Sequence, residues 1–179
     1  MENRIVIAGF GGQGVVVAGK ILAEAGLMEN KHILGMVSYG AEMRGGTANT
    51  IVTISDDEIL SPIIDSPNIA VLLNTPSLLK FEPRLAKDSK VVINSGIVDT
   101  EPSRDDINIS KVNVTKIAQD LGHIRVANIV ALGVLIAKTK MLSKESVIAA
   151  IKKTFGEKKP EFVYINIKAF EEGIKAAGE

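Results

Sequence analysis

The stretch RIVIAGFGGQGVVVAGKILAEAG, residues 4–26, decides the fold. Its first seven residues are apolar and β-branched at nearly consecutive positions, which is typical of a parallel strand buried on both faces. After Gly14 the apolar residues recur at helical spacing, with Lys20 and Glu24 on the other side. The stretch therefore predicts a strand, a glycine turn and a helix, as at the start of an α/β sheet.

The glycines between the strand and the helix match the spacing G-x-G-x-x-G through Gly9, Gly11 and Gly14. Such a loop lets backbone N–H groups approach an anion near a helix N-terminus, although a tight turn and close packing explain glycines equally well. An NAD site would also need an acidic residue at the end of the second strand, where residues 32–35 read HILG. The loop geometry is retained, and an ordinary NAD enzyme is disfavoured.

The rest of the chain alternates short apolar strands with helical patterns. Strands are expected at 32–39, 47–55, 68–74 and 90–96, a short strand and a helix ending at Gly122 within 111–122, and helices at 76–86, 126–139, 144–155 and 162–177. We expect one Rossmann-like α/β domain over residues 1–179, with a largely parallel open sheet flanked by helices and a helical C-terminal part. The alternating threonines predict that strand 47–55 is less buried than the first, and segment 99–110 should be the most flexible.

Composition excludes several classes of function. The 21 basic and 21 acidic side chains balance, so nothing attracts nucleic acid or an anionic membrane in general. The chain has no cysteine, which excludes thiolate catalysis and cysteine-bound clusters held by this chain alone. His32 and His123 are isolated, so no metal site is expected, and Asn128 within an apolar helix should anchor a neighbouring loop. The absence of a leader pattern predicts a cytoplasmic location.

A second polar loop occurs in SYGAEMRGGTANT, residues 38–50. Arg44 followed by Gly45 and Gly46 can present a planar cation beside open backbone amides, which suits a carboxylate or phosphate. Alternatively, Glu42 and Arg44 form a solvated pair or a docking surface. Both loops should open at the carboxyl edge of the sheet, where ligands of such folds usually bind.

Four stretches together carry a family resemblance: GFGGQGVVVAGKILAEA (9–25), SYGAEMRGGTANTIVTIS (38–55), NIAVLLNTPSLLKF (68–81) and ANIVALGVLI (127–136). In this order they resemble the gamma subunit, or the equivalent fused domain, of 2-oxoacid:ferredoxin oxidoreductases, most closely the 2-oxoglutarate type. Ala41 departs from the proline expected there, which removes no chemical group.

The resemblance implies oxidative decarboxylation of a 2-oxoacid to acyl-CoA, with electrons passed to ferredoxin. It also implies thiamine diphosphate, Mg, iron–sulfur clusters and CoA in a complex with alpha, beta and delta subunits, none of these cofactors being held by this chain alone. No catalytic residue can be named. The residues expected to face an anion or a partner are Gly11, Gly12, Gln13, Gly14, Glu42, Arg44, Gly45, Gly46 and Thr47. The alternatives are a free-standing nucleotide-binding module or small NAD-dependent dehydrogenase, and a purely structural subunit.

Overall fold

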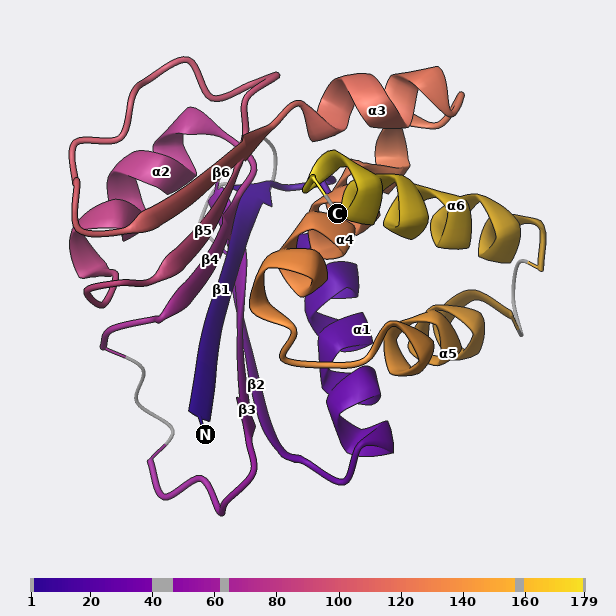
Figure 1. The fold of residues 1–179 in the computed structure, drawn as a ribbon, viewed down its shortest axis with the longest axis horizontal. Coiled ribbons are helices and arrows are strands. Elements are labelled where there is room, and N and C mark those ends of the chain that lie inside the picture. The colour runs from indigo at the N-terminus through magenta and orange to yellow at the C-terminus, as the bar shows by residue number, and fades with distance from the viewer. Residues whose placement is uncertain (1, 40–46, 62–64, 157–159, 179) are drawn as a thin grey trace.

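The computed structural model describes residues 2–39, 47–61, 65–156 and 160–178. The first part of the chain combines strands with helices, and the C-terminal part is helical (Figure 1). In chain order the elements are β1 (Glu2–Phe10), α1 (Val15–Met28), β2 (His32–Tyr39), β3 (Thr47–Ser55), β4 (Ile69–Leu72), α2 (Thr75–Phe81), the 3-10 turn η1 (Glu82–Arg84), β5 (Lys90–Asn94), β6 (Asn108–Val112), α3 (Val114–Asp120), the 3-10 turn η2 (Ile124–Val126), α4 (Ala127–Thr139), α5 (Lys144–Gly156) and α6 (Pro160–Ala176).

The described strands form one sheet in the order β2-β3-β1-β4-β5-β6. β1, β4, β5 and β6 run parallel, whereas β3 is antiparallel to both β1 and β2. Because β1 and β2 are each antiparallel to β3, they point the same way, and β3 alone is reversed. The predicted α/β fold with a largely parallel sheet is confirmed.

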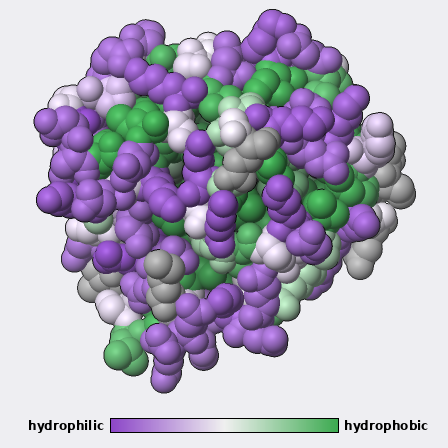
Figure 2. Space-filling model, viewed as in Figure 1, coloured by the Kyte–Doolittle hydropathy of each residue, from purple (hydrophilic) through white to green (hydrophobic). Residues whose placement is uncertain are grey.

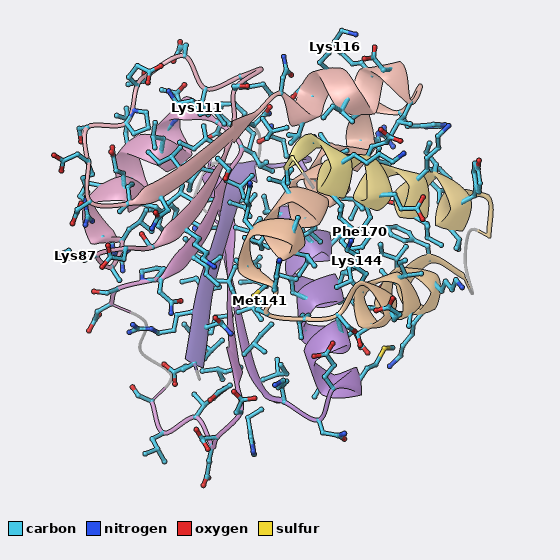
Figure 3. All side chains as sticks on the ribbon, viewed as in Figure 1. Lys87, Lys111, Lys116, Met141, Lys144 and Phe170 are labelled. Carbon is cyan, nitrogen blue, oxygen red and sulfur yellow. The ribbon has the colours of Figure 1, made fainter. Side chains whose placement is uncertain are left out.

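Two apolar layers enclose the sheet. Alternate residues of β1 face opposite sides, so that Ile5 and Ile7 join one core while Val6 and Ala8 join the other. The larger core packs under α1 and α4, with α3, α5 and α6 outside, and the smaller core packs under α2 (Figure 1). Phe170 points inward from α6 and is fully buried (Figure 3).

The predicted elements match the structure closely, with boundary differences of a few residues. The predicted strands 32–39 and 47–55 coincide with β2 and β3, while the predicted strands 68–74 and 90–96 shorten to β4 and β5. Gly122 has a φ of +81°, in keeping with its predicted place after a helix end. In the predicted helix 76–86, α2 ends at Phe81 and a 3-10 turn continues through Pro83.

The expectation that strand 47–55 is less buried than β1 was wrong. Asn49, Thr50, Thr53 and Ser55 are all buried, because β3 lies inside the sheet between β1 and β2. The hydroxyl of Thr50 donates to the carbonyl of Met36 at 3.2 Å. The hydroxyl of Thr53, by contrast, is buried without a hydrogen-bond partner among the described residues. Alternating threonines therefore mark a buried strand here, and not a solvated face.

Segment 99–110 is held more firmly than its polarity suggested. Asn108–Ser110 already belong to β6, and Arg104 forms an ion pair with Asp106 at 2.6 Å. Arg104 also donates to the carbonyl of Leu85 at 2.6 Å, which ties the segment to η1. These contacts argue against the flexibility expected there. Within the described ranges, no helix is both long and apolar enough to cross a bilayer.

Candidate functional site

The candidate site lies at the carboxyl edge of the sheet, beside the end of β1. The register pairs Phe10 with Thr47, and Tyr39 with Ala48. The glycine loop after β1 and the residues that flank segment 40–46 are therefore neighbours at this edge, although their positions in the sequence are some 30 residues apart.

Part of the predicted site cannot be placed. Glu42, Arg44, Gly45 and Gly46 lie outside the described residues, and for Thr47 only the backbone is described, as the first residue of β3. Gly11, Gly12, Gln13 and Gly14 are all described. Their geometry is what the structure contributes to the site.

A cavity opens where the winding of the sheet reverses. α1 covers one face and α2 the other, so β1 and β4 flank the point at which the connections diverge. This is where open α/β sheets usually bind ligands. The cavity measures about 210 Å³ and is lined by Gly12, Gln13, Leu73, Asn94, Ile97, Thr115, Ile124, Arg125 and Ala127.

The glycine loop leaves its backbone open to this edge. Gly11 and Gly12 are exposed, and a Cβ added to either would meet nothing within 4 Å. α1 then begins at Val15 with no side-chain cap and no acidic residue in its first turn. Because the first N–H groups of a helix have no partner within it, this end carries partial positive charge. The loop and the helix end together suit an anion.

Gln13 lines the cavity and also holds the loop in shape. Its side chain folds back, and Oε1 accepts a hydrogen bond from the backbone N–H of Phe10 at 2.6 Å. The backbone N–H of Gln13 donates to the carbonyl of Phe10 at 3.1 Å. Gln13 therefore closes the turn and fixes its shape, and the exposed glycines present the open surface.

Asn128 anchors the other end of the loop, as the sequence predicted. This side chain from the first turn of α4 is 4% exposed, and its Nδ2 donates to the carbonyl of Gly14 at 2.9 Å. Its Oδ1 is buried and has no hydrogen-bond partner among the described residues. Asn128 also lines a second cavity of about 250 Å³, between the loop and Phe155 and Phe162.

Arg125 is the functional candidate that the sequence did not reveal. It lines both cavities together with Gly12, is exposed, and forms no ion pair within the described part of the chain. A guanidinium beside open backbone N–H groups suits a carboxylate or phosphate. No motif surrounds Arg125, and more than a hundred residues separate it from the loop, so only the fold brings the two together.

Asn94 and Thr115 were also missed, and they shape the cavity from inside. Nδ2 of Asn94 donates to the hydroxyl of Thr115 at 2.9 Å, and its Oδ1 accepts from the backbone of Gly96 at 3.2 Å. Since Asn94 is 1% exposed and bonded within the chain, it supports the wall. The described lining of this cavity consists of apolar side chains, amides, a hydroxyl and one guanidinium, which suit the binding of a ligand.

The hydrogen bond from Thr75 at the start of α2 lowers the pKa of Asp99 near this edge, but the most strongly shifted carboxyl group lies elsewhere. The hydrogen bond from Lys31 lowers the pKa of Asp56 to about 2, and this pair sits beside His32 and Ser55, at the opposite end of β2 and β3. Across the described ranges, no three metal-ligating side chains gather into a cluster.

The sheet order adds a structural argument against a dinucleotide. In a dinucleotide fold, the acid that binds the ribose ends a parallel strand beside the first. Here β3 occupies that place and runs the other way, so the position beside Phe10 is Thr47 at the start of a strand.

Comparison with known proteins settles the family. The chain matches the family described as Pyruvate ferredoxin/flavodoxin oxidoreductase over residues 4–176. It belongs to this family.

Relatives and a solved structure agree with this assignment. Ketoisovalerate oxidoreductase subunit VorA of Methanothermobacter thermautotrophicus is 37% identical over 99% of this chain and 37% of its own length. 2-Oxoglutarate synthase subunit KorC of Methanocaldococcus jannaschii is 35% identical over 100% of this chain and 96% of its own. The crystal structure of a keto/oxoacid ferredoxin oxidoreductase gamma subunit from Geobacter sulfurreducens shares 32% identity, covers 98% of both chains and superposes with a TM-score of 0.85.

The relatives differ in how much of their own length this chain covers. The chain spans little more than a third of the VorA relative and nearly the whole of the KorC relative. The same fold is therefore found both as part of a longer polypeptide and as a chain of this size.

Proposed function

We propose that the chain is a gamma-type subunit of a 2-oxoacid:ferredoxin oxidoreductase, located in the cytoplasm. The complex decarboxylates a 2-oxoacid oxidatively to its acyl-CoA and passes the electrons to ferredoxin. The proposal rests on the family match, which covers residues 4–176 and therefore nearly the whole chain. A free-standing dehydrogenase lacks comparable support.

The partner subunits supply the redox chemistry. This chain has no cysteine with which to bind an iron–sulfur cluster, so the clusters would be held by partner chains. We assign the thiamine diphosphate and Mg to the same alpha, beta and delta chains, where thiamine diphosphate would supply the electron sink for decarboxylation. This chain contributes an anion-binding edge that completes or covers a site built on those partners.

The exposed glycines show whether the loop has room for an anionic group at this edge. A Cβ at Gly11 or Gly12 would meet nothing, so the loop has room beside its backbone N–H groups. Arg125 adds a cation at the same cavity. We assign Gly11, Gly12 and Gly14 to the anion-facing loop, Gln13 to its closure, and Glu42, Arg44, Gly45, Gly46 and Thr47 to the second wall. Whether the anion is the substrate carboxylate or a CoA phosphate is what binding tests must decide.

2-Oxoglutarate is our first candidate substrate. The KorC relative has almost the same length as this chain, whereas the VorA relative is far longer. The identities of 35% and 37% are too close to choose between the substrates. Chain length does not choose either, because a pyruvate/ketoisovalerate common gamma subunit of Thermococcus kodakarensis is 34% identical and is covered over 92% of its length. The preference for 2-oxoglutarate therefore rests on the resemblance of the four sequence stretches to that type.

The experiment is an assay of the purified complex. This chain is produced with its partner subunits, and CoA-dependent ferredoxin reduction is measured with 2-oxoglutarate, pyruvate and 2-oxoisovalerate. We expect activity with one oxoacid to exceed the others and to require all subunits. Saturable NAD binding with turnover by this chain alone would overturn the proposal.

An Arg44→Ala variant of the same complex separates a site from a scaffold. If Arg44 faces the anion, the complex assembles normally and the KM of an anionic substrate rises. Normal assembly with unchanged kinetics would assign this loop to subunit contact alone.

A further inference from the structure

The edge strand β2 exposes apolar side chains beside an open backbone edge. It pairs with β3 along all eight residues, and on its other side no strand is present among the described residues. Met36 is 42% and Val37 49% exposed. At the end of α1, which packs on β2, Leu27 and Met28 are also exposed. An unprotected edge of this kind offers unpaired N–H and C=O groups to another strand.

The opposite edge strand of the sheet, β6, is protected from pairing with another chain. β6 carries Lys111, which forms an ion pair with Glu101, and charged side chains on an edge strand discourage pairing with another chain. By contrast, Ile33–Tyr39 contains no charged residue and no proline. The two edges of one sheet are therefore treated differently, and only β2 is left open to pairing.

We propose that β2 pairs antiparallel with β2 of a second copy of this chain, around a two-fold axis at Gly35. A two-fold axis perpendicular to a sheet places one residue opposite its own copy. With Gly35 on the axis, Leu34 lies opposite Met36 of the second copy and Ile33 lies opposite its Val37. Both faces of the paired β2 strands then carry apolar cross-strand pairs, which stabilise antiparallel sheets.

Charge favours a second copy over a charged partner segment. Lys31 and Asp56 near the start of β2 pair with each other within the same chain, and Glu58 lines a hollow with His32, Ile33 and Leu34. Within Ile33–Tyr39 itself, a two-fold contact brings no like charges together. A charged peptide would find no opposite charge along Ile33–Tyr39 to select it. The proposed dimer does not depend on the oxidoreductase activity, so the dimer proposal and the proposed function can fail independently of each other.

Sedimentation equilibrium of the purified chain across a concentration series tests the proposal. We expect a reversible dimer. A Met36→Lys/Val37→Lys double variant places four lysines close to the axis and should weaken the dimer by about tenfold or more, equivalent to about 1.4 kcal/mol. The matched control is Leu79→Lys on α2, an exposed leucine at 58% away from β2, which should dimerise like the parent chain.

Hydrogen exchange supplies a second readout that does not depend on mutation. The β2 amides that point away from β3 should exchange more slowly at dimer concentrations than at monomer concentrations. A chain that stays monomeric at its highest soluble concentration overturns the proposal, as does a dimer that survives the double substitution. Protection of these amides only in the complete enzyme complex would also overturn it and would assign the edge to a partner subunit.

Discussion

Gly14 joins the glycine loop to α1 in a conformation that other residues adopt only with strain. Its φ is +71°, and a Cβ there would lie 2.5 Å from Nδ2 of Asn128. We expect Gly14→Ala to lower the free energy of unfolding by about 1–2 kcal/mol from the backbone conformation alone. Displacing Asn128 adds to this loss because Asn128 would give up its bond to the Gly14 carbonyl. Urea unfolding measures the change.

Gly11→Ala is the matched control within the same loop. Nothing lies within 4 Å of a Cβ there, so the free energy of unfolding should stay within about 0.5 kcal/mol of the parent. An equal loss of unfolding free energy in both variants would contradict this geometry. It would show that an added methyl group destabilises both positions of the loop for the same reason.

Asp56 and Lys31 give a prediction about pH. The hydrogen bond from Lys31 lowers the pKa of Asp56 from 3.8 to about 2 in the folded chain. Because the folded value lies below the unfolded one, the pair stabilises the fold fully above pH 3.8, and this contribution is lost as the pH falls toward 2. An NMR titration should find the shifted pKa, and Lys31→Met should return it toward 3.8. An unchanged value in that variant would exclude Lys31 as the main cause.

At the scale of elements, α4 and α6 pack through glycines. A Cβ on Gly133 would lie 2.1 Å from the carbonyl oxygen of Phe170, and one on Gly173 would lie 2.0 Å from that of Val130. Both contacts are with backbone, which cannot rotate away. The two helices therefore approach closely, which brings the buried Phe170 against the core.

Gly133→Ala should lower the free energy of unfolding by about 3 kcal/mol or more, at the upper end for overpacking, because the helices must separate. Gly156→Ala at the end of α5 is the control, since a Cβ there meets nothing and alanine favours a helix. Thermal unfolding of both variants provides the comparison. A parent-like melting temperature for Gly133→Ala would mean that α6 can move outward at little cost.

Two regions of the molecular surface are suited to different roles. The carboxyl edge gathers open backbone, cavities and Arg125, and β2 leaves an apolar edge. On the face shown in Figure 2, hydrophilic side chains lie between the apolar areas. We therefore expect function to depend on the carboxyl edge in the assembled complex.

Arg125→Ala in that complex tests the edge directly. Hydrogen bonds to a charged group contribute about 1.5–3 kcal/mol, so the KM of the anionic ligand should rise by about tenfold to a hundredfold with subunit assembly unchanged. Arg84→Ala is the matched control, because Arg84 is equally an exposed arginine but lies on η1, near the ring of Phe81. Equal kinetic effects in the two variants would point to general charge loss and not to a binding site.

The order of the elements follows from the amino-acid sequence alone. Apolar periodicity located β1, α1, β2, β3 and the three C-terminal helices, because the side-chain period differs between a strand and a helix. Local chemistry also predicted Asn128 as an anchor, since a buried amide must find a partner. The family resemblance came from stretches spread along the whole chain, which is why it specified more than the glycine spacing.

Which elements become neighbours is visible only in the folded chain. Periodicity shows that a strand is buried but does not identify its partners, so the insertion of reversed β3 between β1 and β2 was not foreseen, and β3 was expected to be too exposed. Arg125 reaches the glycine loop for the same reason, through contacts between residues far apart in sequence. The sequence predicted the loop, and the fold supplied the cavity, the cation beside it and the open edge of β2.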